Sequence, residues 1–146
     1  MKPFAAILLG VIIIQFSSCS SEPQPLVYGK DVCQFCKMTL RDKKFGAELS
    51  TKEGKTYKFD DIGCLERFLN SNARLRMDYS YQLVVDYAHP GELINAAEAL
   101  YIQSPAVKSP MQGNIAAFNT KKERDSFNND WHGKQISWDD IVKELK

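Results

Sequence analysis

Three sulfur-containing side chains lie within six residues of one another in the first third of the chain. Cys33, Cys36 and Met38 form the pattern C-x-x-C-x-M. Soft thiolate and thioether ligands select Cu(I) over hard cations, whereas zinc prefers four strong nitrogen or sulfur ligands. If Cys36 and Met38 lie on extended chain, their side chains point to the same side. The methionine therefore favours copper binding by this segment.

The C-x-x-C pair has other known uses, which the spacing leaves open. It occurs in structural disulfides and in thioredoxin-type redox motifs, and Met38 taken alone also fits ordinary core packing. The redox motif belongs at the start of a helix that follows a strand, but here the pair precedes a predicted β-hairpin. The alternative to a copper carrier is a thiol-disulfide oxidoreductase, or a reductant of a copper site, that uses Cys33 and Cys36.

The remaining residues of metal-binding types have simpler structural explanations. Cys64 falls in a predicted helix, where a free cysteine is commonly a small buried hydrophobe, so we expect core packing, with a ligand role as the alternative. His89 precedes Pro90 in a loop and His132 lies near a helix end, and we expect both at the surface. The sequence offers no pattern of general base, oxyanion site and paired nucleophile, which favours a carrier over an enzyme.

The N-terminus is predicted to direct export. Lys2 precedes an uncharged apolar run over residues 4–14. The run is shorter than the ~20 residues that a spanning helix needs and fits the central region of a secretory signal. We therefore expect a signal peptide over residues 1–18.

The signal is predicted to end at a lipidated cysteine. Ser17 and Ser18 precede Cys19 as in a bacterial lipobox, with Phe16 where leucine is usual. The alternative is an ordinary cleaved signal with an incidental cysteine. We expect acylation of Cys19, as with palmitate, followed by a flexible tether over residues 19–30. Such a lipoprotein would be anchored to a bacterial membrane and face the periplasm.

Composition sets further limits on function. The 146 residues include 19 basic and 18 acidic side chains, for a net charge of +1. A nearly neutral chain lacks the field that would neutralise phosphates, so nucleic acid is not an expected partner. Four cysteines are too few for a disulfide-stapled scaffold.

The elements that must position the sulfur atoms follow a repeated order. Strands are predicted at 45–50, 55–59 and 81–87, with a helix after Asp60-Asp61 that falls between the last two. The second half repeats this order, with strands at 100–103, 114–118 and 135–138, a helix from Thr120 to about 130, and a last helix from Ser137. The pairs Phe59/Phe118 and Phe68/Phe127 occupy equivalent positions, and each is separated by 59 residues.

These patterns predict an α+β fold of two small ββαβ repeats packed together. The domain would span residues 31–146, with halves at about 31–88 and 98–146. Because each half has only about 60 residues, neither would be very stable alone.

Three segments of the sequence resemble motifs of the NosL family, in the family's order. They are residues 31–39, 58–65 and 109–118, and the resemblance spans about 28–142. NosL proteins are lipoproteins encoded with nitrous oxide reductase, and they act as copper chaperones for its maturation. The resemblance implies two ββαβ halves, related to the N-terminal region of organomercurial lyase. Lys37 and Gln112 stand where the family usually has glycine.

The resemblance also implies a ligand set and a partner. Cys36 and Met38 match the core of the family's copper site, Cys33 matches a further cysteine, and Met111 could complete a Cu(I) site from the second half. It implies a membrane-anchored, non-enzymatic carrier that delivers copper to nitrous oxide reductase in denitrification.

Overall fold

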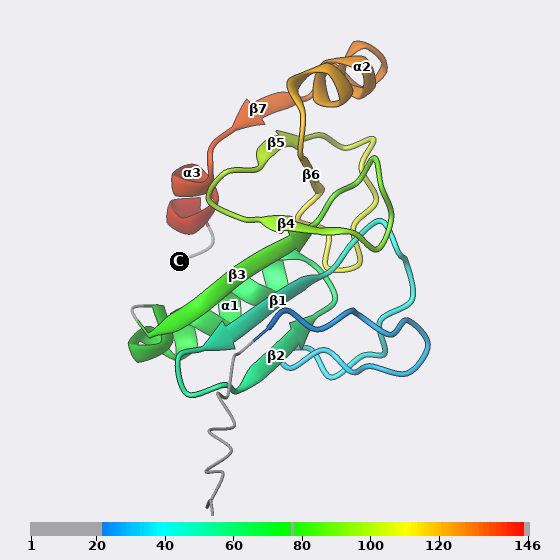
Figure 1. Cartoon of the computed structure of the whole chain (residues 1–146). Coiled ribbons are helices and arrows are strands. Elements are labelled where there is room, and N and C mark those ends of the chain that lie inside the picture. Colours follow the sequence, from blue (N-terminus) through cyan, green and yellow to red (C-terminus); the bar gives the residue numbers. More distant parts are fainter. Residues whose placement is uncertain (1–21, 77, 145–146) are drawn as a thin grey trace, which may run out of the picture.

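The computed structural model describes residues 22–76 and 78–144 (Figure 1). The predicted signal peptide and Cys19 lie outside these ranges, so their prediction is not tested. Within the described ranges, no helix combines the length and the apolar character needed to cross a bilayer.

The first half is a four-stranded antiparallel sheet with one helix on it. The strands are β1 (Ala47–Thr51), β2 (Thr56–Phe59), β3 (Tyr79–Val85) and β4 (Leu93–Asn95), in the order β2-β1-β3-β4. Helix α1 (Ile62–Ser71) contacts β1 and β2, and a 3₁₀ turn (Ala73–Arg76) follows it. The sequence does not predict β4, because three residues are too few to show an alternating pattern.

The second half is a three-stranded antiparallel sheet that stands above the first in Figure 1. Its strands are β5 (Leu100–Gln103), β6 (Ile115–Phe118) and β7 (Lys134–Ile136), in the order β6-β5-β7. Helix α2 (Lys121–Trp131) contacts β5 and β6, and helix α3 (Trp138–Glu144) ends the described chain.

The two halves share one topology, which confirms the predicted pair of ββαβ repeats. In each half a hairpin is followed by a helix, and the next strand pairs with the first strand of the hairpin. The equivalent phenylalanines also pack alike. The ring centroids of Phe59 and Phe68 are 5.2 Å apart, and those of Phe118 and Phe127 are 5.3 Å apart.

The two halves pack directly on each other, as predicted. A parallel bridge joins Asp86 to Ala117, and the Tyr87 amide donates to the Ala117 carbonyl at 2.8 Å. The Tyr87 ring then contacts Phe45 of the first half and Trp131 of α2, edge to face. Aromatic packing therefore makes one body of the two small sheets.

Part of the segment expected to be a tether packs on the first half of the domain. The Gln24 amide donates to the Glu48 carboxylate at 3.0 Å, and the Tyr28 hydroxyl donates to the Phe45 carbonyl at 2.7 Å. Leu26 is buried against Gly46 so closely that a Cβ there would clash. Residues 24–28 of the expected tether therefore contact the folded domain, and the Leu26 side chain gains by burial there.

Candidate metal centre

The C-x-x-C-x-M segment forms a tight loop just before β1. Its base is closed by a bridge between Val32 and Thr39, and the Cys33 amide donates to the Met38 carbonyl at 2.8 Å. The Gln34 amide donates to the Lys58 carbonyl at 2.8 Å, which ties the loop to β2. The peptide hydrogen bonds therefore hold Cys33 firmly against the sheet.

The chain between the second cysteine and the methionine is not extended, contrary to the geometry considered from the sequence. Lys37 has a φ of 64°, in the left-handed region, and its amide donates to the Cys33 carbonyl at 3.0 Å. The turn directs the two side chains differently. Cys36 is half-buried, whereas Met38 is 46% exposed.

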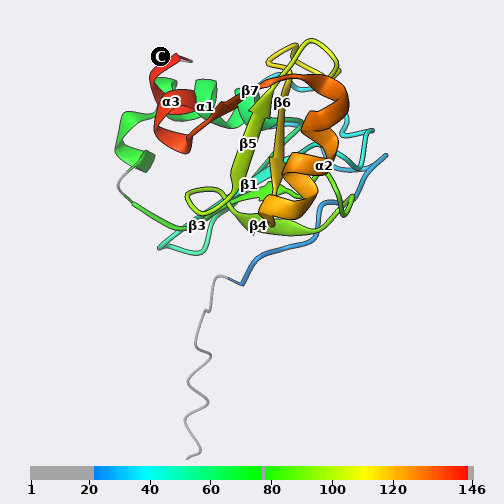
Figure 2. The ribbon, with the colours of Figure 1, turned by 90° about the horizontal axis from the view of Figure 1, so that it is seen from above.

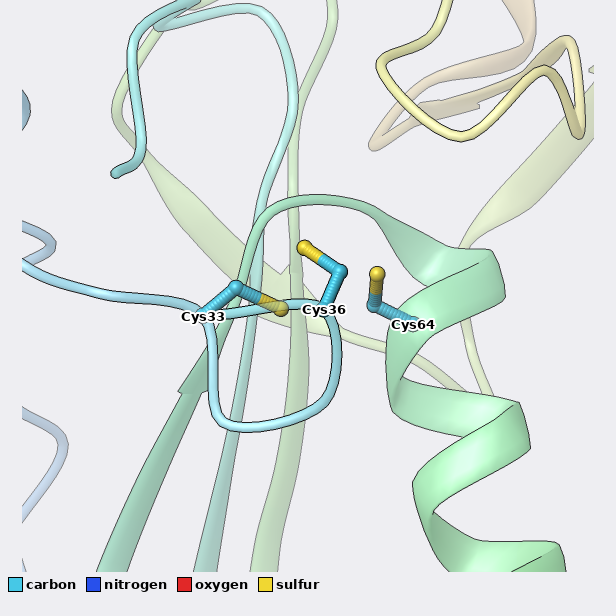
Figure 3. A group of neighbouring side chains, drawn as sticks. All are labelled: Cys33, Cys36 and Cys64. Carbon is cyan, nitrogen blue, oxygen red and sulfur yellow. The ribbon is translucent and has the colours of Figure 1, made fainter. Parts of the chain in front are cut away.

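Cys64 reaches the same place from the first turn of α1. Asp61 is the N-cap of the helix, and its Oδ1 accepts the Cys64 amide at 2.9 Å. Figure 3 shows the Cys64 side chain facing the loop that carries Cys33 and Cys36. The sequence places the helix start after Asp60-Asp61, and Asp61 is the residue that caps it.

The sulfur atoms of Cys33, Cys36 and Cys64 form one cluster. All three are free thiols, and each sulfur lies within 4.8 Å of the other two. Cys33 and Cys64 are fully buried, and Cys36 alone has partial access to solvent. Three convergent sulfur atoms with one accessible side suit a thiophilic metal ion.

Hydrogen bonds and burial lower the pKa of one of the three thiols and raise the pKa of the other two. The Cys64 thiol donates to Cys33, and with the amides of Cys36, Asp60 and Phe35 it lowers the pKa of Cys33 to about 5. The same bond, with burial, strongly raises the pKa of Cys64. Burial is the main cause that raises the pKa of Cys36. At neutral pH the cluster therefore carries one thiolate that is ready to bind a cation.

An open pocket of about 530 Å³ adjoins the loop that carries Cys36, and its lining includes Lys37, Met38, Arg41, Asp60 and Pro110. Burial, together with the charges of Asp61 and Cys33, raises the pKa of the Asp60 carboxyl to about 6. The pocket brings the Met38 loop next to the loop that carries Met111.

Asp61 also connects that second loop to α1. Its Oδ2 accepts the Met111 amide at 2.9 Å across 50 residues of sequence. The Met111 side chain is partly buried and packs, like Cys36, against the main hydrophobic core. The loop of Cys33, Cys36 and Met38 and the loop of Met111 therefore meet at the N-terminal end of α1, and the thiols of Cys33 and Cys36 belong to the cysteine cluster.

The sequence favoured core packing for Cys64 and left a ligand role as the alternative. The core packing predicted for it is correct, since the residue is fully buried, but its sulfur faces the other two. No local pattern could reveal this, because Cys64 lies 28 residues after Cys36. The signals were the presence of a third cysteine after Cys19 and its place in the segment 58–65 that resembles a NosL motif.

The two histidines do not contribute to the cluster, and both are exposed as predicted. His132 ends α2 with left-handed backbone. His89 lies between two carboxylates, with Nδ1 at 3.0 Å from Asp86 and Nε2 at 3.4 Å from Glu123. The ligand atoms of Asp86, His89 and Glu123 also lie within 4.8 Å of one another. Because both ring nitrogens face carboxylates, an ion-paired imidazole accounts for this group without a metal.

Comparisons with known proteins agree on one family. The family model described as NosL matches residues 26–146. The crystal structure of the copper chaperone NosL from Shewanella denitrificans superposes with a TM-score of 0.70 at 23% sequence identity, covering 85% of this chain and 98% of that one. At this identity the match establishes the fold. No curated protein sequence matches the chain.

Proposed function

The chain belongs to the NosL family, and on this premise we propose that it is a membrane-anchored Cu(I) carrier that delivers copper for the maturation of nitrous oxide reductase. The observation that carries the proposal is the cluster of three cysteine sulfurs, each within 4.8 Å of the others. The similar structure from Shewanella denitrificans is that of a copper chaperone, which is a carrier rather than an enzyme.

The surroundings of the cluster suit a carrier, which must hold copper tightly and still release it. Cys36 is partly exposed, and the exposed Met38 lines the adjacent pocket. A ligand from a recipient protein can attack the ion from this side, so that copper passes by ligand exchange. The proposed ligands are Cys36 and Met38, with Cys33 and Met111 available to complete the shell.

The acidity of the thiols argues against the alternative of a thiol-disulfide oxidoreductase. An attacking cysteine needs both a low pKa and access to its substrate. Here the thiol with the lowered pKa, Cys33, is fully buried, and the partly accessible Cys36 has a raised pKa. The low pKa and the access to a substrate therefore belong to different cysteines.

The direct test is a Cu(I) titration of the reduced protein in competition with a chelator. Losing a residue that only supports a metal ligand already costs about 10–100-fold in metal affinity. Cys36→Ser removes a proposed ligand itself, so it should lower the Cu(I) affinity by at least tenfold. Met38→Leu keeps the side-chain size, removes the thioether and should have a smaller effect. Val32→Ala, which truncates another exposed apolar side chain at the base of the loop, should have none.

A Cys36→Ser protein that binds Cu(I) as tightly as the wild type would exclude Cys36 as a ligand. Two results would overturn the carrier function. One is a wild-type protein that does not retain Cu(I) against the chelator. The other is insulin-reducing activity that depends on both Cys33 and Cys36, because it would support the redox alternative.

The membrane anchor is tested separately. Radiolabelled palmitate should enter the wild-type protein in bacterial cells and should not enter Cys19→Ser. Equal labelling of the two proteins would show that the lipobox assignment is wrong.

A further inference from the structure

The spacing of the three cysteine sulfurs matches a three-coordinate ion. With metal–sulfur bonds of about 2.3 Å, three sulfurs in a plane around one ion lie about 4.0 Å apart. The sulfurs of Cys33, Cys36 and Cys64 are already within 4.8 Å of one another. Only a small inward movement is needed to close such a shell.

Two of the three cysteines stand on parts of the fold that cannot move easily. Cys64 is in the first turn of α1, and its amide is fixed by Asp61. Cys33 is fully buried in a loop that hydrogen bonds to β2 through Gln34. Figure 3 shows Cys36 beside these two, and because Cys36 is partly exposed it forms the solvent-accessible side of the cluster.

Backbone groups offset the negative charge that three thiolates would gather. The amides of Phe35, Cys36 and Asp60 donate hydrogen bonds to the Cys33 sulfur. The N-terminal end of α1, which carries a partial positive charge, lies at Cys64. These amides and the helix end therefore offset part of the charge that several thiolates around one cation would carry.

The methionines occupy the outer side of this arrangement. Met38 is 46% exposed and lines the open pocket with Asp60 and Pro110. Met111 is on the adjoining loop, held at its amide by Asp61. Neutral thioethers at the open side would add a weak fourth ligand and would bind the ion transiently while it enters or leaves the site.

From this geometry we propose that Cys64 is a metal ligand and that the loaded centre is a three-thiolate site made by Cys33, Cys36 and Cys64. For copper the proposal rests on the proposed carrier function. The arrangement itself accepts thiophilic cations as a class, because thiolate is the only ligand type in the cluster.

Cadmium offers a direct count of the thiolates, because thiolate-to-cadmium charge transfer absorbs in the ultraviolet and thioethers do not contribute in the same way. The reduced, metal-free protein would be titrated with Cd(II). The wild type should show the absorbance of three thiolates against a peptide of known thiolate number. Cys64→Ala and Cys36→Ser should each lose about a third of it, since each removes one thiolate of three.

A matched control separates loss of the ligand from loss of packing. Ile62 is buried in the same turn of α1, and Ile62→Val leaves a small void without touching a sulfur. It should keep the full cadmium absorbance. Cys64→Ala should also lower the Cu(I) affinity by about tenfold or more, and Ile62→Val should not.

The outcomes distinguish this proposal from the carrier function. If the wild-type protein shows the absorbance of only two thiolates, Cys64 is not a ligand. The same follows if Cys64→Ala folds and keeps both the absorbance and the Cu(I) affinity of the wild type. Tight Cu(I) binding would then leave the carrier function intact. Three thiolates on cadmium without retention of Cu(I) against the chelator would instead overturn the carrier function and keep the assignment of Cys64.

Discussion

Lys37 and Gln112, next to the methionines of the candidate site, hold left-handed backbone, with φ values of 64° and 59°. Both stand at positions where the NosL family usually has glycine. The structure supplies the physical reason for that preference, because a Cβ in this region of φ strains the chain and glycine has none. This chain keeps the loop conformation without the glycines.

We predict that Lys37→Gly stabilises the metal-free protein relative to Lys37→Ala by about 1 kcal/mol. Both variants lose the bond from the lysine ammonium to the Gln34 carbonyl, so their difference reports the backbone alone. Urea denaturation measures it. Equal midpoints for the two variants would mean that the left-handed conformation carries no strain.

Among the elements, the N-terminus of α1 organises the site. It presents Cys64 to the loop of Cys33 and Cys36, and it carries Asp61, whose two oxygens bind amides from both halves of the molecule. The carboxylate is buried, so each of these bonds is shielded from water. The equivalent α2 has no fully buried residue and serves as an outer cover.

We predict that Asp61→Asn costs about 1–2 kcal/mol of unfolding free energy in the metal-free protein. The asparagine oxygen can still cap Cys64, but its amide nitrogen faces the Met111 amide donor to donor, and a buried bond is lost. Asp140→Asn makes the same change at the exposed cap of α3 and should cost less. Equal denaturation midpoints for the two variants would contradict the bridging role of Asp61.

At the scale of the whole molecule, His89 links the first half to α2. Its ring contacts the carboxylates of Asp86 and Glu123. The hydrogen bond to Asp86 is the main cause that raises the pKa of His89, and the charges of Glu123, Asp86 and Glu92 add to it. Protonation therefore strengthens the contact between the two halves.

The sign of the pH dependence follows from this raised pKa. The stabilisation by His89 is complete below its unfolded-state pKa of about 6.5 and is lost as the pH rises through the higher folded-state value. We predict that His89→Gln lowers the melting temperature most at about pH 6 and least at about pH 9. Melting curves of both proteins across this range are the measurement, and a constant or growing difference toward pH 9 would contradict the prediction.

The sequence by itself determined the local features of this protein. Hairpins and helices were predictable because their signals are local, such as the caps at Asp61 and Thr120 and the apolar spacing of Ile62, Leu65 and Phe68. The repeated order of elements, and so the two ββαβ halves, followed from these signals. The sulfur pattern from Cys33 to Met38 indicated soft-metal chemistry for the same reason, since all its members lie within six residues.

Only the tertiary structure decided which sulfurs meet. Cys64 joins Cys33 and Cys36 because α1 packs across the β1–β2 hairpin, and helical periodicity cannot tell a buried thiol in the core from one that faces a distant loop. Met38 turns outward because Lys37 takes left-handed backbone, which its residue type does not indicate. The Asp61–Met111 bond spans 50 residues and exists only because the two halves pack together. Contacts between elements arise from how their surfaces fit, and that information is spread over the whole chain.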